Sequence, residues 1–354
     1  MRLEPRSTRS TAALLIAPMG AVAFTLAISA LLVLWAGAPV AATFGLLAKG
    51  AVGSVFAISE TLTRATPLIL TGLSAAVAFK ARLFNVGAEG QLYAGALAAV
   101  AVGGLHGGEG FGLPLWLLFP GMMLAAALAG ALLLLGPALL KNKLSVDEVV
   151  TTLLLNFIVL LFVGAMLDGP MKDASAMGWP QSVGLQPDLE LSKLIAQTRL
   201  HTGLLWGIVL GVLLWALIKF TTFGFDMRAL GANARAAAFA GVPITRTVVL
   251  VAMLSGALAG LAGAIEVAGR AGYVTLEMSP GYGYSGIVIA MLAALNPLGV
   301  LVASVFIAGV IVGADSMSRA MAVPRYLADV MVATSLLSVL VATMLTQYKI
   351  RWRG

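Results

Sequence analysis

The chain contains no cysteine, which excludes disulfide bonds and thiolate metal sites. Its two histidines, His106 and His201, lie far apart in the sequence and leave too few ligands for a catalytic metal centre. Charged residues make up only 10% of the chain, against about 25% in an average soluble domain. A soluble protein with 60% hydrophobic residues could not cover its surface with polar groups. These shortages indicate an integral membrane protein.

Apolar runs long enough for a membrane-spanning helix, roughly 17–25 residues each, recur along the whole chain. Two further runs, 282–295 and 298–314, are shorter and meet at Asn296-Pro297, where continuation of a helix is disfavoured. We therefore predict an all-α polytopic membrane protein with about ten transmembrane helices, some broken or short, in one domain over residues 1–354. The two short runs form either two spans or a re-entrant pair. The clear runs are 12–36, 64–80, 86–104, 113–140, 146–167, 203–219, 246–268 and 326–346.

Segment 40–60 is apolar but carries Lys49 and Glu60, and we interpret it as a short helix on the outer face. With the N-terminus inside, alternation through the remaining spans puts most of the 22 basic residues on the inner side and most of the 15 acidic residues outside. The positive-inside rule then predicts that both termini are cytoplasmic and that residues 168–202 form an outer loop. An inverted repeat is compatible with this topology.

Residues 220–245 form the predicted inner loop. Helix-forming residues from Arg228 to Ala240 precede the stop signal Gly241-Val242-Pro243, which predicts a short cytoplasmic helix. Such a helix suits docking into a groove of an ATPase, and the alternative is a basic loop that contacts lipid headgroups. The Walker A pattern does not occur, so the chain does not bind ATP by that route.

Glu89 is the ionisable residue that best fits a functional role inside a span, because no basic residue lies three or four positions away. It stands with Asn85, Gln91 and two glycines at the start of run 86–104, which predicts a broken helix there. These three side chains either line or gate a substrate path or form hydrogen bonds between closely packed helices.

Further polar residues in the predicted spans have two interpretations each. Asn156 either joins helices or lines the path. Tyr282 and Tyr284 either anchor a helix at the membrane surface or stack on a planar solute. Asn296 either makes a turn or lies deep in the membrane on a re-entrant pair.

Two local patterns predict ordinary helix-stabilising contacts. Glu266 and Arg270 are spaced i,i+4, so we expect them to pair along one helix face. Ser145-x-x-Glu148 fits a capping box at the start of run 146–167.

Five stretches of the chain have patterns that a family resemblance can be built on. They are Glu60-Thr-Leu-Thr-Arg-Ala-Thr-Pro-Leu-Ile-Leu-Thr-Gly-Leu-Ser74, Leu83-Phe-Asn-Val-Gly-Ala-Glu-Gly-Gln91, Asp147-Glu-Val-Val-Thr-Thr-Leu-Leu-Leu-Asn156, the loop from Gly224 to Gly241, and Gly286-Ile-Val-Ile-Ala-Met-Leu-Ala-Ala-Leu-Asn-Pro-Leu-Gly299. These stretches resemble the permeases of ABC importers for nucleosides, in the superfamily that also includes ribose-type sugar and branched-chain amino acid permeases. The resemblance covers roughly residues 40 to 350.

The resemblance implies a transport subunit without catalytic residues, metal or nucleic acid, in the bacterial cytoplasmic membrane. It implies three partners: a second homologous permease, an ABC ATPase that binds ATP-Mg, and an extracytoplasmic solute-binding lipoprotein. The solute stays open between a nucleoside, a simple sugar and a branched-chain amino acid. An ion-coupled secondary transporter that acts alone is the alternative of another class, with Glu89 as its cue. The residues implied in coupling to the ATPase are Asp226, Arg228, Gly231, Asn233, Arg235 and Ala237.

Overall fold

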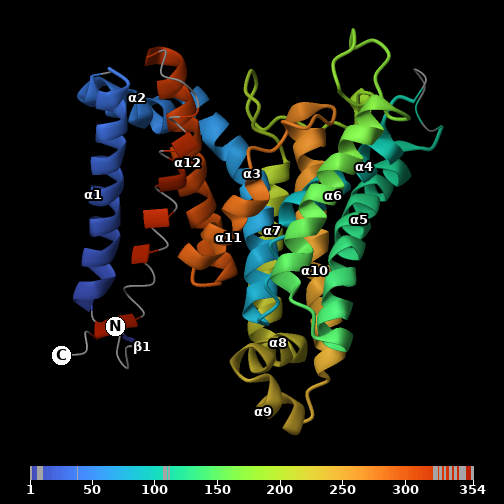
Figure 1. Cartoon of the computed structure of the whole chain (residues 1–354). Coiled ribbons are helices and arrows are strands. Elements are labelled where there is room, and N and C mark those ends of the chain that lie inside the picture. The colour runs from blue at the N-terminus through green and yellow to red at the C-terminus, as the bar shows by residue number, and fades with distance from the viewer. Residues whose placement is uncertain are drawn as a thin grey trace. The chain divides into compact units, whose positions relative to one another are not determined.

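The computed structural model of the chain consists mainly of helices in its described part (Figure 1). It describes residues 2–5, 11–37, 39–106, 110, 112–321 and 348–351, with the scattered positions 326, 329–330, 332–334, 337–338 and 341–342. The chain falls into two compact units, and each is described by itself. Residues 1–61 and 305–354 belong to the first unit, and residues 62–304 form the second.

The first unit contains helices α1 (Thr11–Trp35) and α2 (Val40–Val52). Residues Ala23–Trp35 of α1 are bent by 119° against α2. Strands β1 (Arg2–Pro5) and β2 (Tyr348–Arg351) pair in antiparallel fashion. Helices α3 (Val55–Lys80) and α12 (Pro297–Met321) contribute to this unit as well, α3 with its residues up to 61 and α12 with its residues from 305.

The predicted single helix over 40–60 is wrong in its extent. Helix α2 ends at Val52, where the Gly53 N–H donates to the Lys49 carbonyl at 2.8 Å. Ser54 then starts the next helix, because its hydroxyl accepts a hydrogen bond from the Ala57 N–H at 3.0 Å. Residues 55–60 therefore belong to α3, and the position of α2 on the outer face stays a prediction.

The second unit contains the remaining helices and one ordered loop. Helix α10 continues directly into the π-helical turn η2, and helices α3 and α12 both pass from one unit into the other. The helices are α3 (Val55–Lys80), α4 (Ala88–Gly103), α5 (Leu115–Leu144), α6 (Glu148–Asp168), η1 (Pro187–Leu189), α7 (Gly203–Phe220), α8 (Thr222–Ala232), α9 (Ala234–Phe239), α10 (Ile244–Glu266), η2 (Val267–Ala271), α11 (Tyr282–Leu292) and α12 (Pro297–Met321).

Glycines bring the central helices of the second unit close together. A Cβ on Gly130 of α5 would overlap the Gly256 carbonyl of α10, and one on Gly260 would overlap the Ala126 carbonyl of α5. On the other side of α10, a Cβ on Gly263 would overlap the Leu92 carbonyl of α4. Small residues allow this backbone contact, which supplies van der Waals packing where lipid gives little hydrophobic driving force.

Six helices in the described part of the chain are long and apolar enough to span a membrane, or seven with the bent pair of α1 and α2. They are α3, α5, α6, α7, α10 with η2, and α12, which confirms long helices at six of the predicted runs. Run 298–314 is longer than predicted, because α12 continues to Met321. Helices α4 and α11 have only 16 and 11 residues. Run 326–346 lies largely outside the described residues, so a total of about ten spans stays a prediction.

The loop between α6 and α7, residues 169–202, is held by backbone hydrogen bonds over one end of the second unit. Leu185 N–H donates to Gly272 O at 2.8 Å and Leu191 N–H donates to Ala268 O at 2.8 Å. Gln186 N–H donates to Gly103 O at the end of α4, at 2.9 Å. The predicted loop 168–202 is thus an ordered cap over α4 and η2.

Candidate functional site

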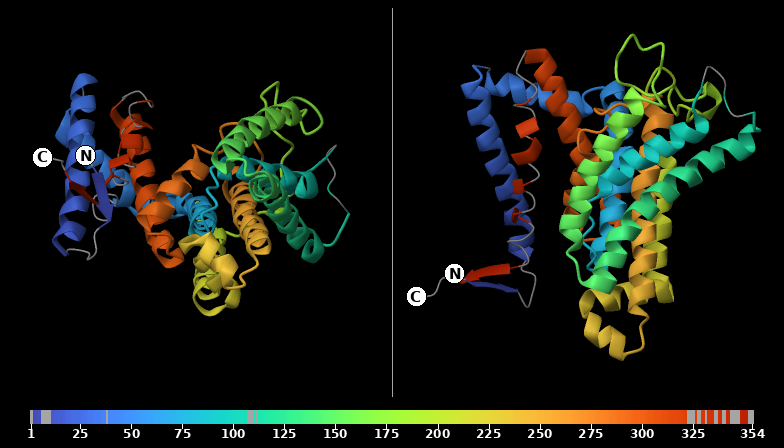
Figure 2. Two further views of the ribbon diagram at one scale, coloured as in Figure 1. Left: turned by 60° about the horizontal axis from the view of Figure 1, so that its bottom comes forward. Right: turned by 45° about the vertical axis from the view of Figure 1, so that its right-hand side comes forward.

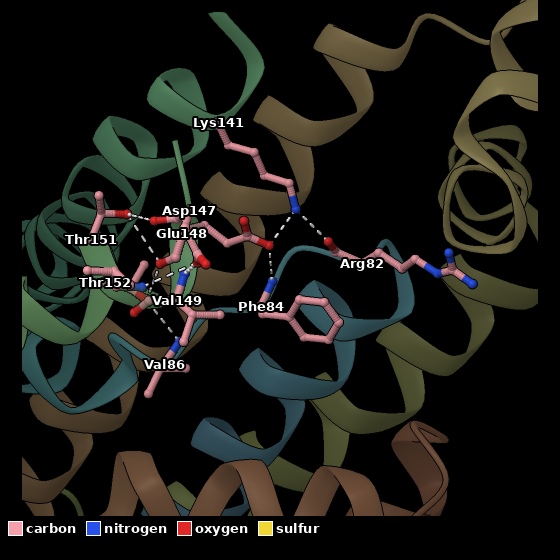
Figure 3. A network of polar contacts seen from close by, with 10 residues as sticks. Arg82, Phe84, Val86, Lys141, Asp147, Glu148, Val149, Thr151 and Thr152 are labelled. Atoms are coloured by element: carbon pink, nitrogen blue, oxygen red, sulfur yellow. Dashed lines mark hydrogen bonds and ion pairs between the residues drawn. The ribbon is translucent and has the colours of Figure 1, made fainter. Parts of the chain in front are cut away.

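The link between α3 and α4, residues 81–87, is not helical although it runs beside α6. Side chains of α6 hold its backbone in place (Figure 3). The Phe84 N–H donates to the Glu148 carboxylate at 3.2 Å, and the Val86 N–H donates to the Thr152 hydroxyl at 3.2 Å. Irregular backbone is tolerated at membrane depth only where it is buried in protein or lines a polar cavity. The predicted break before α4 is confirmed, and we call residues 81–87 the linker.

The linker is also tied to the ends of α5 and α6. Lys141 in the last turn of α5 pairs with Glu148 and donates to the Arg82 carbonyl at 2.7 Å (Figure 3). The predicted capping box is wrong, because Ser145 ends α5 in the left-handed conformation, with φ 54°. Asp147 caps α6 instead, and its carboxylate accepts hydrogen bonds from the first turn. Glu148 therefore serves the linker and Lys141.

A second polar cluster joins the linker to three helices. Asn85 and Gln91 bond reciprocally through their amides at 2.9 Å in both directions. Asn85 also donates to the Ser255 hydroxyl of α10 at 3.1 Å, and Ser255 lies 3.0 Å from the Ser74 hydroxyl of α3. All four side chains are at most 1% exposed. The structure thus brings the predicted Asn85 and Gln91 together in a buried network within the chain.

Asn156 links α6 to the linker, α4 and α11. Its side-chain oxygen accepts from the Gly90 N–H at 2.8 Å, and its amide donates to the Val86 carbonyl at 2.9 Å. The same amide group donates to the Tyr284 hydroxyl at 3.1 Å. Asn156 is fully buried. Its contacts are those of the predicted role of joining helices, extended to a tyrosine that reaches the surface.

Glu89 lies at the N-terminal end of α11. Its carboxylate accepts from the Gly283 N–H at 2.6 Å, and a Cβ on Gly283 would overlap the Glu89 backbone N–H group. Only 3% of Glu89 is exposed. A helix N-terminus presents unpaired N–H groups and a positive dipole end, which stabilise a carboxylate there. These are contacts between helices, whereas a direct contact of Glu89 with solute stays a prediction.

The two tyrosines of α11 differ sharply in exposure. Tyr282 is 1% exposed, so the interpretation as a membrane-surface anchor is wrong for this residue. Tyr284 is 38% exposed. Asn296 lies beyond α11 and is exposed, and its side-chain oxygen accepts from the Leu298 N–H at 3.1 Å. It therefore caps α12, as the turn interpretation requires.

The predicted helix from Arg228 to Ala240 is two helices, α8 and α9, because the backbone is extended at Asn233. The Asn233 side chain caps α9 by accepting from its first N–H groups. Helix α8 packs against the end of α3, where a Cβ on Gly231 would overlap the Lys80 carbonyl. The stop signal is confirmed, since Gly241 has φ 85°.

Several of the predicted coupling residues face the permease itself. Ala237 is buried, Asp226 is half-buried, and Arg228 donates to the Ile218 carbonyl at the end of α7. Arg235 is exposed, and Phe239 is 97% exposed at the end of α9. Phe225 of α8 is also 58% exposed, so both helices carry an exposed aromatic ring. Phe239 was not predicted, because a single aromatic residue among alanines gives no signal of its exposure in the sequence.

The last turns of α3, α5 and α7 lie at the end of the second unit that carries α8 and α9 (Figures 1 and 2). Helices α3, α5 and α7 all have basic residues in their last turns at this end, and α10 starts there with Arg246. The ordered loop 169–202 lies at the other end, over η2 and the end of α4. The residues in the last turns are Lys80, Lys141, Lys143 and Lys219.

Several residues of the two clusters were not predicted from the sequence. Ser74, Ser255 and Thr152 are isolated hydroxyls within apolar helices, and nothing in their neighbours distinguishes them from ordinary helix positions. Their role depends on which helices meet, which only the fold decides. The arrangement of amides, hydroxyls and carboxylates fixes helices against one another and against the linker.

Comparisons with known proteins agree along most of the chain. The family described as branched-chain amino acid transport system / permease component matches residues 57–345. The guanosine ABC transporter permease protein NupP of Bacillus subtilis is 33% identical over 328 residues, which cover 92% of both chains. The glucose ABC transporter permease protein TsgB13 of Haloferax volcanii is 35% identical, covering 87% of this chain and 82% of its own. The nucleoside ABC transporter permease protein NupB of Lactococcus lactis is 32% identical, covering 76% and 75%.

Proposed function

Because the chain belongs to the family of branched-chain amino acid transport system permease components, we propose that it carries a nucleoside across the bacterial cytoplasmic membrane as part of an ABC importer. It is a multi-pass permease subunit and not itself an enzyme, and its family implies an ATPase partner and a second permease. The observation that supports a nucleoside is the similarity to a guanosine permease over 92% of both chains.

We propose that the end of the second unit with α8 and α9 faces the cytoplasm. The basic last turns of α3, α5 and α7 support this orientation, because basic residues are retained on the cytoplasmic side. With about ten spans, both termini then lie in the cytoplasm. Pairs of spans related by an inverted repeat fit the same arrangement.

Helices α8 and α9 dock into the ATPase, which holds ATP-Mg, in this proposal. The exposed Phe239 and Arg235 supply the contact surface. Gly231 lets α8 lie directly on the end of α3 at Lys80. A movement of α8 is thereby transmitted to α3 and to the linker that follows it.

The solute path lies along the exposed side of Tyr284 in this proposal. A planar aromatic ring that is 38% exposed can stack on a nucleobase, and base stacking on aromatic side chains tolerates different bases. The neighbouring non-helical linker fits a polar path at membrane depth. Asn85, Gln91 and Asn156 support the walls of this path from inside the fold.

The extracytoplasmic lipoprotein meets the opposite end in this proposal, at the loop 169–202. The tip of that loop turns at Met177, with φ 50°, and Gly178, with φ 91°. Met177 and Trp179 are 102% and 62% exposed there. Asp173 stiffens the turn, because its carboxylate accepts from the Ser175 N–H at 2.8 Å. A stiff loop with exposed Met and Trp suits protein recognition.

Transport in reconstituted vesicles tests the proposal. The chain, its second permease, the ATPase and the lipoprotein are placed in proteoliposomes, and uptake of labelled guanosine is measured with glucose and leucine as competitors. We expect uptake that requires ATP and all four proteins and that only nucleosides inhibit. Inhibition by glucose or leucine would instead favour a sugar or amino acid permease. Uptake by the chain alone, driven by a proton or sodium gradient, would favour the secondary transporter.

A further inference from the structure

Helix α11 starts in the interior of the second unit rather than at a membrane surface. It has 11 residues and is therefore about 16 Å long, roughly half the thickness of the hydrocarbon core. Its N-cap residue Gly281 is in the left-handed conformation, with φ 83°. The unpaired N–H groups of its first turn thus lie where water cannot satisfy them, and the protein must do so.

Side chains from three helices meet this first turn. Glu89 of α4 accepts from the Gly283 N–H at 2.6 Å, and Thr71 of α3 donates to the Tyr282 carbonyl at 3.0 Å. Asn156 of α6 donates to the Tyr284 hydroxyl at 3.1 Å. Three successive residues of α11 are therefore fixed from three directions.

Steric contact reinforces the bond from Glu89. A Cβ on Gly283 would overlap the backbone N–H group of Glu89, so the backbones of α4 and α11 touch without an intervening side chain. Glu89 is 3% exposed, and its carboxylate accepts a hydrogen bond from the backbone of α11. Glu89 thus holds α11 in place, whereas the ring of Tyr284 remains accessible one residue beyond Gly283.

We infer that Glu89 and Asn156 are positioning residues, which do not contact the solute but hold the ring of Tyr284 in the solute path. Glu89 fixes the backbone of α11 at residue 283, and Asn156 fixes the hydroxyl of the ring. This inference rests on the proposed function for the solute, while the position of α11 rests on the contacts alone. In this inference Glu89 anchors α11 and does not carry protons for ion-coupled transport.

Replacement of Glu89 by Gln keeps the shape but removes the negative charge at the first turn of α11. It also puts an NH₂ group opposite the Gly283 N–H or leaves one uncharged oxygen to accept from it. We expect the apparent KM for guanosine to rise on the order of tenfold, the size of a lost stacking contact, while transporter assembly is retained. The matched control is Glu277→Gln, the same chemical change at an exposed carboxylate in the loop before α11. It should leave KM unchanged.

The absence of cysteine from the chain provides a direct reporter of α11. Tyr284→Cys is made alone, with Glu89→Gln and with Glu277→Gln, and the rate of labelling by a water-soluble maleimide is measured in the reconstituted complex. We expect the Glu89→Gln partner change to speed labelling severalfold and the Glu277→Gln change to have no effect. An equal labelling rate with and without Glu89→Gln would overturn the positioning role.

Two further outcomes separate the inference from the proposed function. Guanosine should slow the labelling of Tyr284→Cys; if labelling responds to Glu89→Gln but never to guanosine, the positioning holds and the solute path at Tyr284 is overturned. Should Glu89→Gln fail to assemble, Tyr284→Phe removes only the ring hydroxyl and its bond to Asn156. We expect it to raise KM severalfold without changing the maximal rate, and an unchanged KM would overturn the role of Asn156.

Discussion

The linker region and the helices α8 and α9 use polar and apolar side chains in opposite ways. Around the linker, amides and hydroxyls such as Asn85 and Ser255 are buried and bonded to one another. On α8 and α9, large apolar side chains are exposed, with Phe225 at 58% and Phe239 at 97%. Polar groups inside the membrane domain thus hold helices together, whereas the exposed rings on α8 and α9 are the contact surface that we propose for the ATPase.

This contrast changes how motifs in such a chain are interpreted. A polar residue in an apolar run invites a role in solute contact, yet here its hydrogen bonds are used within the chain. The proposed contacts with solute and ATPase fall instead on two exposed aromatic rings, Tyr284 and Phe239.

Gly231→Ala should have the largest effect. A Cβ at this position would overlap the Lys80 carbonyl, and backbone cannot move aside as a flexible side chain can. We expect a cost at the upper end of the roughly 1–3 kcal/mol for overpacking, and uptake about a hundredfold lower in the proteoliposome assay. Gly121→Ala is the control, because a Cβ at Gly121 meets nothing within 4 Å. Equal loss in both variants would contradict the contact between α8 and α3.

Asn156→Ala tests the buried side of the contrast. The change leaves the Gly90 N–H and the Val86 carbonyl without their partner in the interior. We expect the free energy of unfolding to fall by about 2 kcal/mol, measured by denaturation in detergent micelles. Asn296→Ala, which removes an exposed cap of α12, should cost less than half as much. A similar fall in the free energy of unfolding for Asn156→Ala and Asn296→Ala would contradict the expected effect of burial at Asn156.

Phe239→Ala tests the exposed side. Because the ring is 97% exposed in the chain itself, its removal should leave folding unchanged. An anchor residue of an interface is worth about 1–2 kcal/mol, so we expect roughly tenfold weaker binding of the ATPase, measured by titration of the purified subunit. Thr245→Ala, at another exposed position of the same end, should not weaken binding. Unchanged ATPase affinity of Phe239→Ala would remove Phe239 from the interface.

His201 offers a smaller, pH-dependent test in the loop before α7. Burial, and then the neighbouring Arg270, lowers the pKa of His201 to about 4, against about 6.5 in an unfolded chain. Between these two values the unfolded chain binds a proton that the folded chain does not, so the free energy of unfolding falls as the pH drops from about 6.5 to 4.

We expect this loss to reach about 1 kcal/mol between pH 7 and 5.5, measured by thermal denaturation in detergent. The variant His201→Gln lacks the titrating group and should lose less over the same interval. A wild-type chain with the same pH dependence as His201→Gln would show that this histidine does not contribute.

The sequence predicted the helices better than their surroundings. Six long helices, the break before α4, the Glu266–Arg270 pair and the stop at Gly241 are confirmed, because length, hydropathy and local chemistry determine them. The break at Asn233 was missed, since a capping asparagine inside a run of alanines looks like a helix interior.

Which residues face the interior could not be predicted. In α6, Val159 and Val163 are buried while Ile158 and Leu161 are exposed, although all four are aliphatic. Helices that are apolar on every side carry no periodic signal for their packed face. For the same reason the hydrogen-bond partners of Asn156 and Glu89 could not be predicted, although the sequence marked both residues as candidates.

The glycine contacts between α5 and α10 have a mechanical consequence. Two helices that touch backbone to backbone at Gly130, Gly256 and Gly260 cannot slide past each other without a clash. We therefore expect α5 and α10 to move together as one rigid pair. We therefore expect movement during transport where the backbone is not helical, at the linker 81–87 and between α11 and α12. In the proposed docking of α8 to the ATPase, a force on α8 passes to Lys80, which directly precedes the linker.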